Sequence, residues 1–206
     1  TAPIIVCNEE HRFIVAEQCK EINVEPKEII LEPFGKNTAP AIISATLRVF
    51  EENKNANLLI LSSDQIMSNI KQFRLAVEKA KILSQKGKIV LFGVLPNTPD
   101  TGYGYIKIDK QPNLSKLEAK NIIKFIEKPN LRDAEIFLKN GKYLWNSGIF
   151  MFKTLTLIDE VKKYSLKNFY AVEKSYENKI KDLDFIRLDK DSYEKCENLS
   201  IDFAIM

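Results

Sequence analysis

Short apolar runs alternate with helix-forming stretches in the first 95 residues, and this alternation constrains the fold more than any other feature. The runs are rich in β-formers and occupy residues 4–7, 28–32, 58–61 and 88–95. Between them, helices are predicted after Asn8, from about Ala39 to Glu52, and after Asn69, where polar caps precede apolar residues at helical spacing. Strands separated by helices in this way are typical of βαβ units. We therefore predict an α/β fold with a mixed, mostly parallel sheet flanked by helices.

The pattern changes after Pro96. Strands are expected near 103–108, 117–126 and 143–152, with a short helix near 131–139, and residues 155–181 have a helical, polar-faced pattern. This mixture predicts antiparallel or mixed strands that extend the same sheet. Because no linker or repeat interrupts the chain, we predict one domain over residues 1–206.

Composition excludes several classes of function. The net charge is +3, from 31 basic and 28 acidic residues that are interspersed, so nucleic acid is not expected as a partner. Three widely spaced cysteines without a C-x-x-C pattern indicate a reducing, cytoplasmic compartment. His11 is the single histidine, which nearly excludes a metal site built on histidines and a Ser-His-Asp triad within this chain. No apolar run approaches the roughly 20 residues that span a membrane, so no membrane partner is expected.

Polar residues at predicted strand ends are the first candidate site residues, because ligands of open α/β sheets bind beyond the carboxyl ends of the strands. Asp64 follows the strand at 58–61 and could hold Mg²⁺ beside substrate phosphates. Taken alone, it is more often a turn residue. Residues 33–41 join a strand to a helix whose free N–H groups and positive dipole end suit an anion. Here Lys36 adds charge, and Asn37 and Thr38 add polar groups, although a well-capped helix explains the pattern equally well.

Four later segments carry weaker signals. Two glycines at 102 and 104 mark either a bulge or close approach by a ligand. An exposed ion pair is the simpler interpretation of Glu127 and Lys128, which could also bind a sugar hydroxyl and a phosphate. Asn146 lies in an otherwise apolar stretch, and Asp202 lies in an apolar segment near the end. If buried, both need polar partners or a cation.

The order of these segments is specific even though each is weak alone. Together they resemble bacterial mannose-1-phosphate guanylyltransferases over essentially the whole chain, and in particular the group often fused to a mannose-6-phosphate isomerase domain. The segments that carry the resemblance are CNEEHRF at 7–13, GKNTAPA at 35–41, GYGYI at 102–106, FIEKP at 125–129, WNSGIF at 145–150 and SIDFA at 200–204.

The resemblance implies a Rossmann-like nucleotide-diphospho-sugar transferase fold and an enzyme that makes GDP-mannose and pyrophosphate from GTP and mannose 1-phosphate. By motif, Asp64 and Asp202 would hold Mg²⁺, and Lys128 would neutralise the phosphates. The nucleotide would contact a set at the helix start, namely Lys36, Asn37, Thr38, Pro40 and Ala41. The sugar would contact Gly104, Glu127 and Asn146. Dimers are common in the family, and the oligomeric state is left open.

Several features depart from the family. Ser63-Asp64-Gln65 stands where Ala-Asp-His is usual, and Lys36 stands where Arg is common, which keeps the charge but not the bidentate fork. The glycine-rich loop that opens the family has no match here, and we expect segments to be missing at both ends, including any isomerase domain. We therefore expect poor turnover by this span alone.

Three alternatives stay open. One is a non-catalytic relative that only binds a nucleotide sugar, and another is a pyrophosphorylase for a different hexose 1-phosphate. The third is a glycosyltransferase with a D-x-D metal motif at 182–184 or 189–191, where surface charge pairs are the simpler interpretation.

Overall fold

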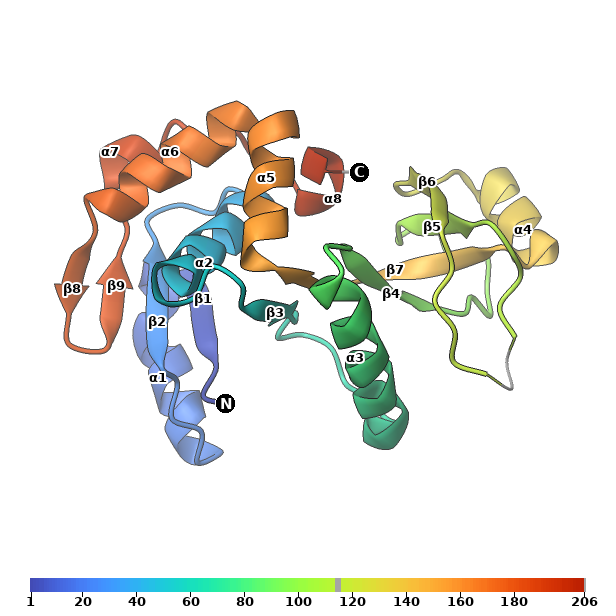
Figure 1. Cartoon of the computed structure of the whole chain (residues 1–206), viewed down its shortest axis with the longest axis horizontal. Coiled ribbons are helices and arrows are strands. Elements are labelled where there is room, and N and C mark those ends of the chain that lie inside the picture. The colour runs from blue at the N-terminus through green and yellow to red at the C-terminus, as the bar shows by residue number, and fades with distance from the viewer. Residues whose placement is uncertain (114–115, 206) are drawn as a thin grey trace. The chain divides into compact units, whose positions relative to one another are not determined.

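A computed structural model describes residues 1–113 and 116–205 (Figure 1). The chain divides into two compact units, which are described separately below. Unit 1 comprises residues 1–56 and 154–205, and unit 2 comprises residues 57–153. Both units combine strands with helices, so the predicted α/β class is confirmed. The single-domain organisation stays a prediction, and its last residue, Met206, lies outside the described residues.

Unit 1 contains a four-stranded sheet in the order β1-β2-β9-β8. These strands span Ile4–Asn8, Glu28–Glu32, Phe185–Arg187 and Ile180–Asp182, respectively. β1 and β9 both run parallel to β2, while β8 pairs antiparallel with β9. Central β2 is almost fully buried, as expected for a parallel strand covered on both faces. The strand predicted at 28–32 is therefore confirmed, but helix was expected over the region where β8 lies.

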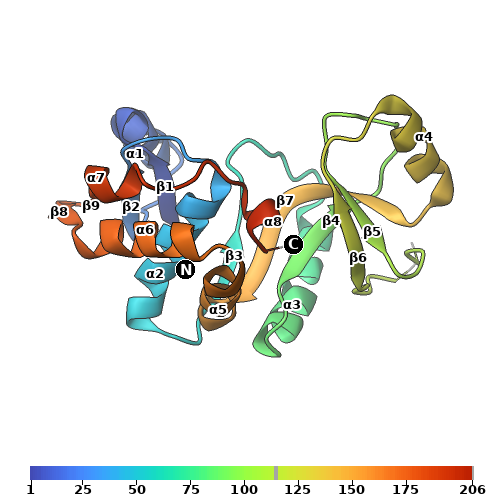
Figure 2. The same ribbon diagram turned by 90° about the horizontal axis from the view of Figure 1, so that it is seen from above.

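The helices of unit 1 pack around α2, which buries most residues from Ala39 to Leu47. Figure 2 shows α5 and α6 beside α2, on the side away from α1. Arg48 of α2 anchors the helix to the sheet through the carboxylate of Glu28, with a second nitrogen 3.0 Å from that group. The helical segments, with a 3₁₀ turn η1 first, are η1 Glu9–His11, α1 Arg12–Glu21, α2 Thr38–Glu52, α5 Thr154–Tyr164, α6 Leu166–Glu177, α7 Lys190–Tyr193 and α8 Ile201–Ile205.

Unit 2 contains an antiparallel sheet in the order β3-β7-β5-β6, with β4 also paired to β7. Its strands are β3 Asn57–Ile60, β4 Val90–Val94, β5 Tyr105–Ile108, β6 Ile122–Ile126 and β7 Tyr143–Lys153. The expectation of one mostly parallel sheet is wrong, because the described residues form two sheets in which only β1–β2 and β2–β9 pair in parallel. The reason lies in β7, an apolar strand of 11 residues. It inserts between β3 and β4, so the strands that helix α3 connects pair with β7 rather than with each other.

Local signals set the two helices of unit 2, α3 Ile70–Gln85 and α4 Leu131–Asn140. Asn69 and Asn130 cap them by accepting hydrogen bonds from backbone amides in the first turn, at 3.0 and 2.9 Å. α4 ends at Gly141, whose φ of 71° is the left-handed cap that glycine favours. One face of α4 packs on β5 and β7, where Phe137 stacks on Tyr143 with ring centroids 4.1 Å apart.

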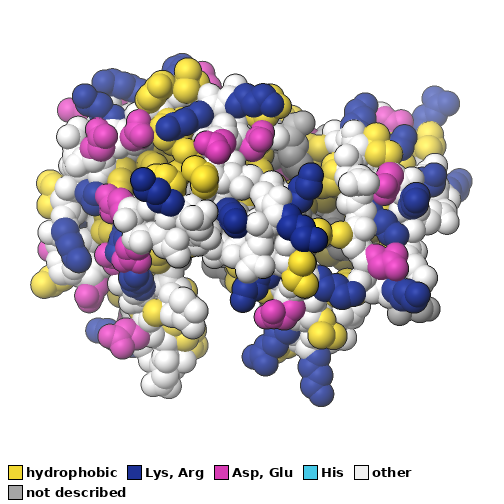
Figure 3. Space-filling model, in the orientation of Figure 1, with side chains coloured by type: hydrophobic (Ala, Val, Ile, Leu, Met, Phe, Trp, Pro, Cys, Tyr) yellow, Lys and Arg dark blue, Asp and Glu magenta, His cyan; other side chains and the backbone are white. Residues whose placement is uncertain are grey.

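Charged side chains of both signs are interspersed on the face in Figure 3, as the sequence predicted. Within the described residues, the helices are all too short or too polar to cross a membrane.

Candidate functional site

The three predicted sugar-binding residues lie in one row across the sheet of unit 2. Tyr105 of β5 pairs with Ile126 of β6 on one side and with Trp145 of β7 on the other. The next residue along each strand is a predicted sugar-binding residue: Gly104, Glu127 and Asn146. The amide of Asn146 donates to the carbonyl of Gly104 at 2.7 Å, which extends the β5–β7 ladder by one step. Strand register thus places Gly104 beside residues that lie 23 and 42 positions further along the chain.

Side chains at the end of the neighbouring strand lie very close to Gly104. A Cβ atom at this position would lie 2.8 Å from Glu127 Oε2 and 2.9 Å from Phe125 Cζ, where real Cβ contacts are rarely shorter than 3.4 Å. Because the glycine has no side chain, the Glu127 carboxylate lies directly against the backbone next to β5. These close neighbours are side chains, so the bulge and the close approach by a ligand both stay predictions.

Lys128 lies beside this row with a left-handed backbone. Its φ is 43°, which is uncommon for a residue other than glycine. Its ammonium is 3.9 Å from Glu127 Oε1, and the two side chains are 66% and 36% exposed. Such an open pair adds little to stability. Backbone strain without a stabilising contact is a feature of binding sites, where it fixes the direction of a side chain.

The loop that carries Asp64 is fastened to β7 by Gln65. Asp64 itself is exposed, in a turn after β3. The side-chain amide of Gln65 donates to the backbone carbonyl of Ser147, and Gly148 reaches the same loop, since its Cβ would lie 3.7 Å from Ser62 Oγ. Gln65 thus holds this loop against β7, a role that no pattern in the sequence indicated. Its only signal was its place beside Asp64, where the family usually has histidine.

In unit 1 the predicted nucleotide-binding loop contains a second strained residue. Asn37 has φ 66° and ψ −169°, a combination that belongs almost entirely to glycine. Its side-chain oxygen accepts from the amide of Thr38 at 2.8 Å, which closes the loop on itself at the start of α2. Two of the predicted site residues, Asn37 and Lys128, are therefore among the four non-glycine residues with positive φ in the described chain.

The C-terminal segment 193–201 clamps this loop. Lys36 Nζ donates to the carbonyl of Glu194 at 3.0 Å, and the Ile201 amide donates to Thr38 Oγ1 at 2.9 Å. Backbone bonds join Leu199 to both Lys36 and Ala39. No motif in the sequence indicated this clamp, because its two halves are about 160 residues apart.

The clamp overturns one expectation about the start of α2. The Thr38 amide is taken by Asn37, the Ala39 amide donates to Leu199 at 3.1 Å, and Pro40 has no N–H. The prediction that this helix start offers free N–H groups to an anion is therefore wrong. Side chains of the loop, rather than the helix N-terminus, are left as candidate ligand contacts.

The two predicted metal ligands belong to different units. Asp202 is half-buried in the first turn of α8, next to Ile201 and thus beside the loop residue Thr38. Asp64 lies in unit 2. Within residues 1–113 and 116–205, no three carboxylate, cysteine or histidine groups form a cluster that could hold a metal ion. As hard oxygen donors the two carboxylates fit Mg²⁺, which takes one or two of them and completes its shell with water and phosphate.

A partly buried carboxyl group lies just before the loop, at Glu32. The hydroxyl of Tyr193, which is fully buried, donates to it. Burial raises the pKa of Glu32 above its ordinary value, and the bond from Tyr193 lowers it in part. Burial also raises the pKa of Cys7 to about 11, with the nearby Glu32 carboxylate as a second cause. At neutral pH this thiol is therefore protonated and a poor nucleophile.

One aspartate of each D-x-D segment makes a structural contact. Asp182 accepts from Arg187 at 3.0 and 3.1 Å, at the start of the tight turn between β8 and β9. Asp189 caps α7 by accepting from the Ser192 amide at 3.0 Å. These contacts favour the simpler interpretation of both segments.

The family model described as nucleotidyl transferase matches residues 1–192. The chain belongs to that family. A mannose-1-phosphate guanylyltransferase of Salmonella montevideo is 43% identical over 208 residues, and the xanthan biosynthesis protein XanB of Xanthomonas campestris pv. campestris strain B100 is 42% identical over 205. These matches include 99% and 100% of this chain. The chain spans only 43% of each relative, so it corresponds to less than half of their length.

Among solved structures, this chain is similar to a Helicobacter pylori protein whose crystal structure is described as mannose-6-phosphate isomerase. The two share 32% identity with a TM-score of 0.87, over 100% of this chain and 78% of the other. The fold of the nucleotidyl transferase family, expected from the motifs, is therefore confirmed.

Proposed function

We propose that the protein transfers GMP from GTP to mannose 1-phosphate, forming GDP-mannose and pyrophosphate. The observation that carries the proposal is the row of Glu127, Gly104 and Asn146 on three adjacent strands. A carboxylate, a bare stretch of backbone and an amide side by side supply both acceptors and donors for the hydroxyls of a hexose. The name of the Salmonella montevideo relative, a mannose-1-phosphate guanylyltransferase, supports the same substrates.

The reaction makes one P–O bond and breaks another. A phosphate oxygen of mannose 1-phosphate attacks the α-phosphorus of GTP, and pyrophosphate leaves from the opposite side with the bonding electrons. The chain contributes mainly position and charge, as in other phosphoryl transfers. Lys128, fixed by its left-handed backbone, would neutralise phosphate oxygens, and Glu127 with Asn146 would hold the sugar.

The nucleotide would contact the loop at 36–41, in which the clamp fixes Lys36, Asn37 and Thr38. Asp64 and Asp202 would hold Mg²⁺, which supplies charge neutralisation at the phosphates when bound. The sugar row belongs to unit 2 and the loop to unit 1. We also infer a cytoplasmic location, from the free cysteines, and a homodimer, from the family alone.

Release of pyrophosphate by the full-length protein tests the proposal. Turnover should require GTP, Mg²⁺ and mannose 1-phosphate, and Lys128→Met should reduce kcat/KM by a factor of about 100 if the ammonium contacts the phosphates. A panel of nucleoside triphosphates and hexose 1-phosphates decides the base and the sugar. Binding of GDP-mannose without any turnover would instead indicate a non-catalytic relative.

A further inference from the structure

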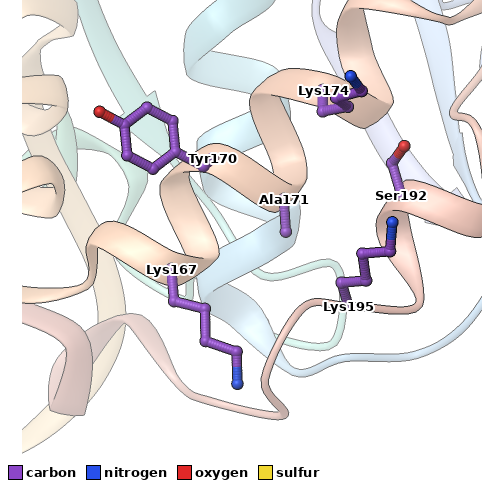
Figure 4. A pocket seen from close by; sticks show the side chains of 6 residues that line it. All are labelled: Lys167, Tyr170, Ala171, Lys174, Ser192 and Lys195. Carbon is purple, nitrogen blue, oxygen red and sulfur yellow. The ribbon is translucent and has the colours of Figure 1, made fainter.

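A cavity of about 480 Å³ lies in unit 1, between α6 and the segment around α7 (Figure 4). Its volume is within the range of small-molecule sites, about 300–1,000 Å³. One wall is a single face of α6, because its residues recur at positions i, i+3, i+4 and i+7. The lining consists of Lys167, Tyr170, Ala171 and Lys174 on α6, with Ser192 and Lys195 opposite.

Hydrogen bonds fix the two walls at both ends of the cavity. At one end Ser175 and Asp189 are joined twice, by the Ser175 hydroxyl to the Asp189 carbonyl at 2.7 Å and by the Asp189 amide to the Ser175 carbonyl at 3.1 Å. At the other end the amide of Glu197 donates to Asn168 Oδ1 at 2.6 Å, and Asn168 is fully buried. These bonds fix the backbone on both sides of the cavity, which is open to solvent and whose lysine side chains are exposed.

The charge of the cavity is positive. Three ammonium groups line it, and two carboxylates lie near. Glu197 pairs with Lys167 at 2.9 Å, in an exposed contact. The Asp189 carboxylate accepts a hydrogen bond from the Ser192 amide. Hydrogen bonds from Ser192 are the main cause that lowers the pKa of Asp189, and the charges of Lys195 and Lys174 are minor causes. Within the described residues, Lys174 and Lys195 make no ion pair within 4 Å of a carboxylate, so two cations are available to a ligand.

The remaining surface of the cavity is hydrocarbon. The lysine stems, the Ala171 methyl and the Tyr170 ring supply it, and Tyr170 is 56% exposed. In Figure 4 the ammonium end of Lys195 lies toward Ser192, while Lys167 and Tyr170 diverge at the other end. A ligand that matches this surface has an anionic group beside Ser192 and a flat apolar group along α6.

We propose that this cavity binds a small phosphate ester that carries an aromatic or similarly flat apolar group. The phosphate would contact Lys174 and Lys195 in charge-assisted bonds, and the apolar group would lie on Ala171 and Tyr170. The site is separate from the candidate sugar row, which belongs to the other unit. It also differs from the candidate nucleotide loop. Lys36 of that loop bonds to the carbonyl of Glu194, which is the residue before Lys195.

Phenyl phosphate is a probe with both required groups and neither sugar nor nucleoside. Its binding to the full-length protein is measured by saturation-transfer NMR, with inorganic phosphate and phenol as single-group probes. We expect a dissociation constant on the order of 1 mM for phenyl phosphate, given its few atoms. Binding at least five times weaker is expected for each single-group probe. Equal affinity for either of them would overturn the proposed ligand class.

Variants test whether phenyl phosphate binds in this cavity. Lys174→Gln with Lys195→Gln should weaken phenyl phosphate binding at least tenfold. Two matched controls remove one lysine elsewhere: Lys20→Gln on exposed α1 and Lys128→Gln beside the sugar row. Both should bind the probe as the parent protein does. Unchanged binding by the double variant, or loss of binding in Lys128→Gln, would refute the proposal. Circular dichroism of the double variant must match that of the parent, and the exposed positions of Lys174 on α6 and of Lys195 in the turn after α7 make this the expected result.

Discussion

Replacing Gly104 by alanine tests whether a bare backbone is required at the centre of the sugar row. The new Cβ would lie 2.8 Å from Glu127 Oε2, 2.9 Å from Phe125 Cζ and 3.0 Å from Phe125 Cε2. An ordinary contact needs about 3.4 Å or more, so both side chains must retreat by roughly half an ångström. Glu127 is partly exposed and can rotate away, but doing so moves the carboxylate that is proposed to hold the sugar.

The expected magnitude follows from two opposing terms. Overpacking of this kind destabilises a protein by about 1–3 kcal/mol. Alanine also restricts the unfolded chain, which returns about 0.4–1 kcal/mol, because φ of Gly104 is not in the left-handed region. The net loss is about 1–2 kcal/mol, or roughly 2–8 °C in the melting temperature of a domain of this size.

Kinetics of the full-length variant provide the second readout. Loss of a hydrogen bond to a charged group is worth about 1.5–3 kcal/mol, which corresponds to roughly a 10- to 100-fold decrease in kcat/KM. We expect this decrease for mannose 1-phosphate, with KM for GTP unchanged. Gly35→Ala is the control for stability, because nothing lies within 4 Å of its added Cβ. Gly104→Ala with the parent's stability and the parent's KM for the sugar would refute the reasoning.

Three further changes test other parts of the molecule. Asn37→Gly relieves the strained backbone, so the free energy of unfolding should be unchanged or slightly higher, while KM for GTP rises several-fold. The control Asn23→Gly, also at positive φ but outside the site, should alter stability alone. Equal kinetic effects of the two variants would contradict a role for the Asn37 side chain. Gln65→Ala removes the bond to Ser147 that holds the Asp64 loop, so about 2- to 10-fold more Mg²⁺ should be needed for half-maximal turnover, and an unchanged requirement would count against that role. Glu32 has a raised pKa, so the folded state holds its proton more tightly than the unfolded state, and stability falls as pH rises above 4.5 through the folded pKa. Glu32→Gln should flatten this fall in urea unfolding between pH 5 and pH 8, and an equally steep fall in the variant would be the opposite result.

Much of the local structure could be predicted from the sequence. The strands β1 and β2 and the caps Asn8 and Asn69 are where the pattern indicated, because a cap needs only a side chain and an amide two or three residues away. The candidate residues Gly104, Glu127 and Asn146 were also found, but through the order of motifs rather than through any spacing that predicts their contact.

Strand order and the clamp could not be predicted in this way. β8 and β9 have three residues each, too few to show a periodic pattern within a polar segment. The bond between Lys36 and Glu194 joins residues 158 positions apart, and neither residue type is unusual in a surface loop. The strained φ of Asn37 and Lys128 is likewise invisible in the chain, since it depends on what the surrounding structure imposes.

The sequence by itself therefore determined many of the longer strands and helices, but not the short strands β8 and β9, because period, caps and turn residues act within a few positions along the chain. Only the tertiary structure decided which strands are neighbours. β7 is apolar enough to pair with β3, β4 or β5, and it pairs with all three, since this arrangement satisfies its backbone groups on both edges. That choice, made between distant segments, places Asn146 beside Gly104 and builds the candidate sugar row.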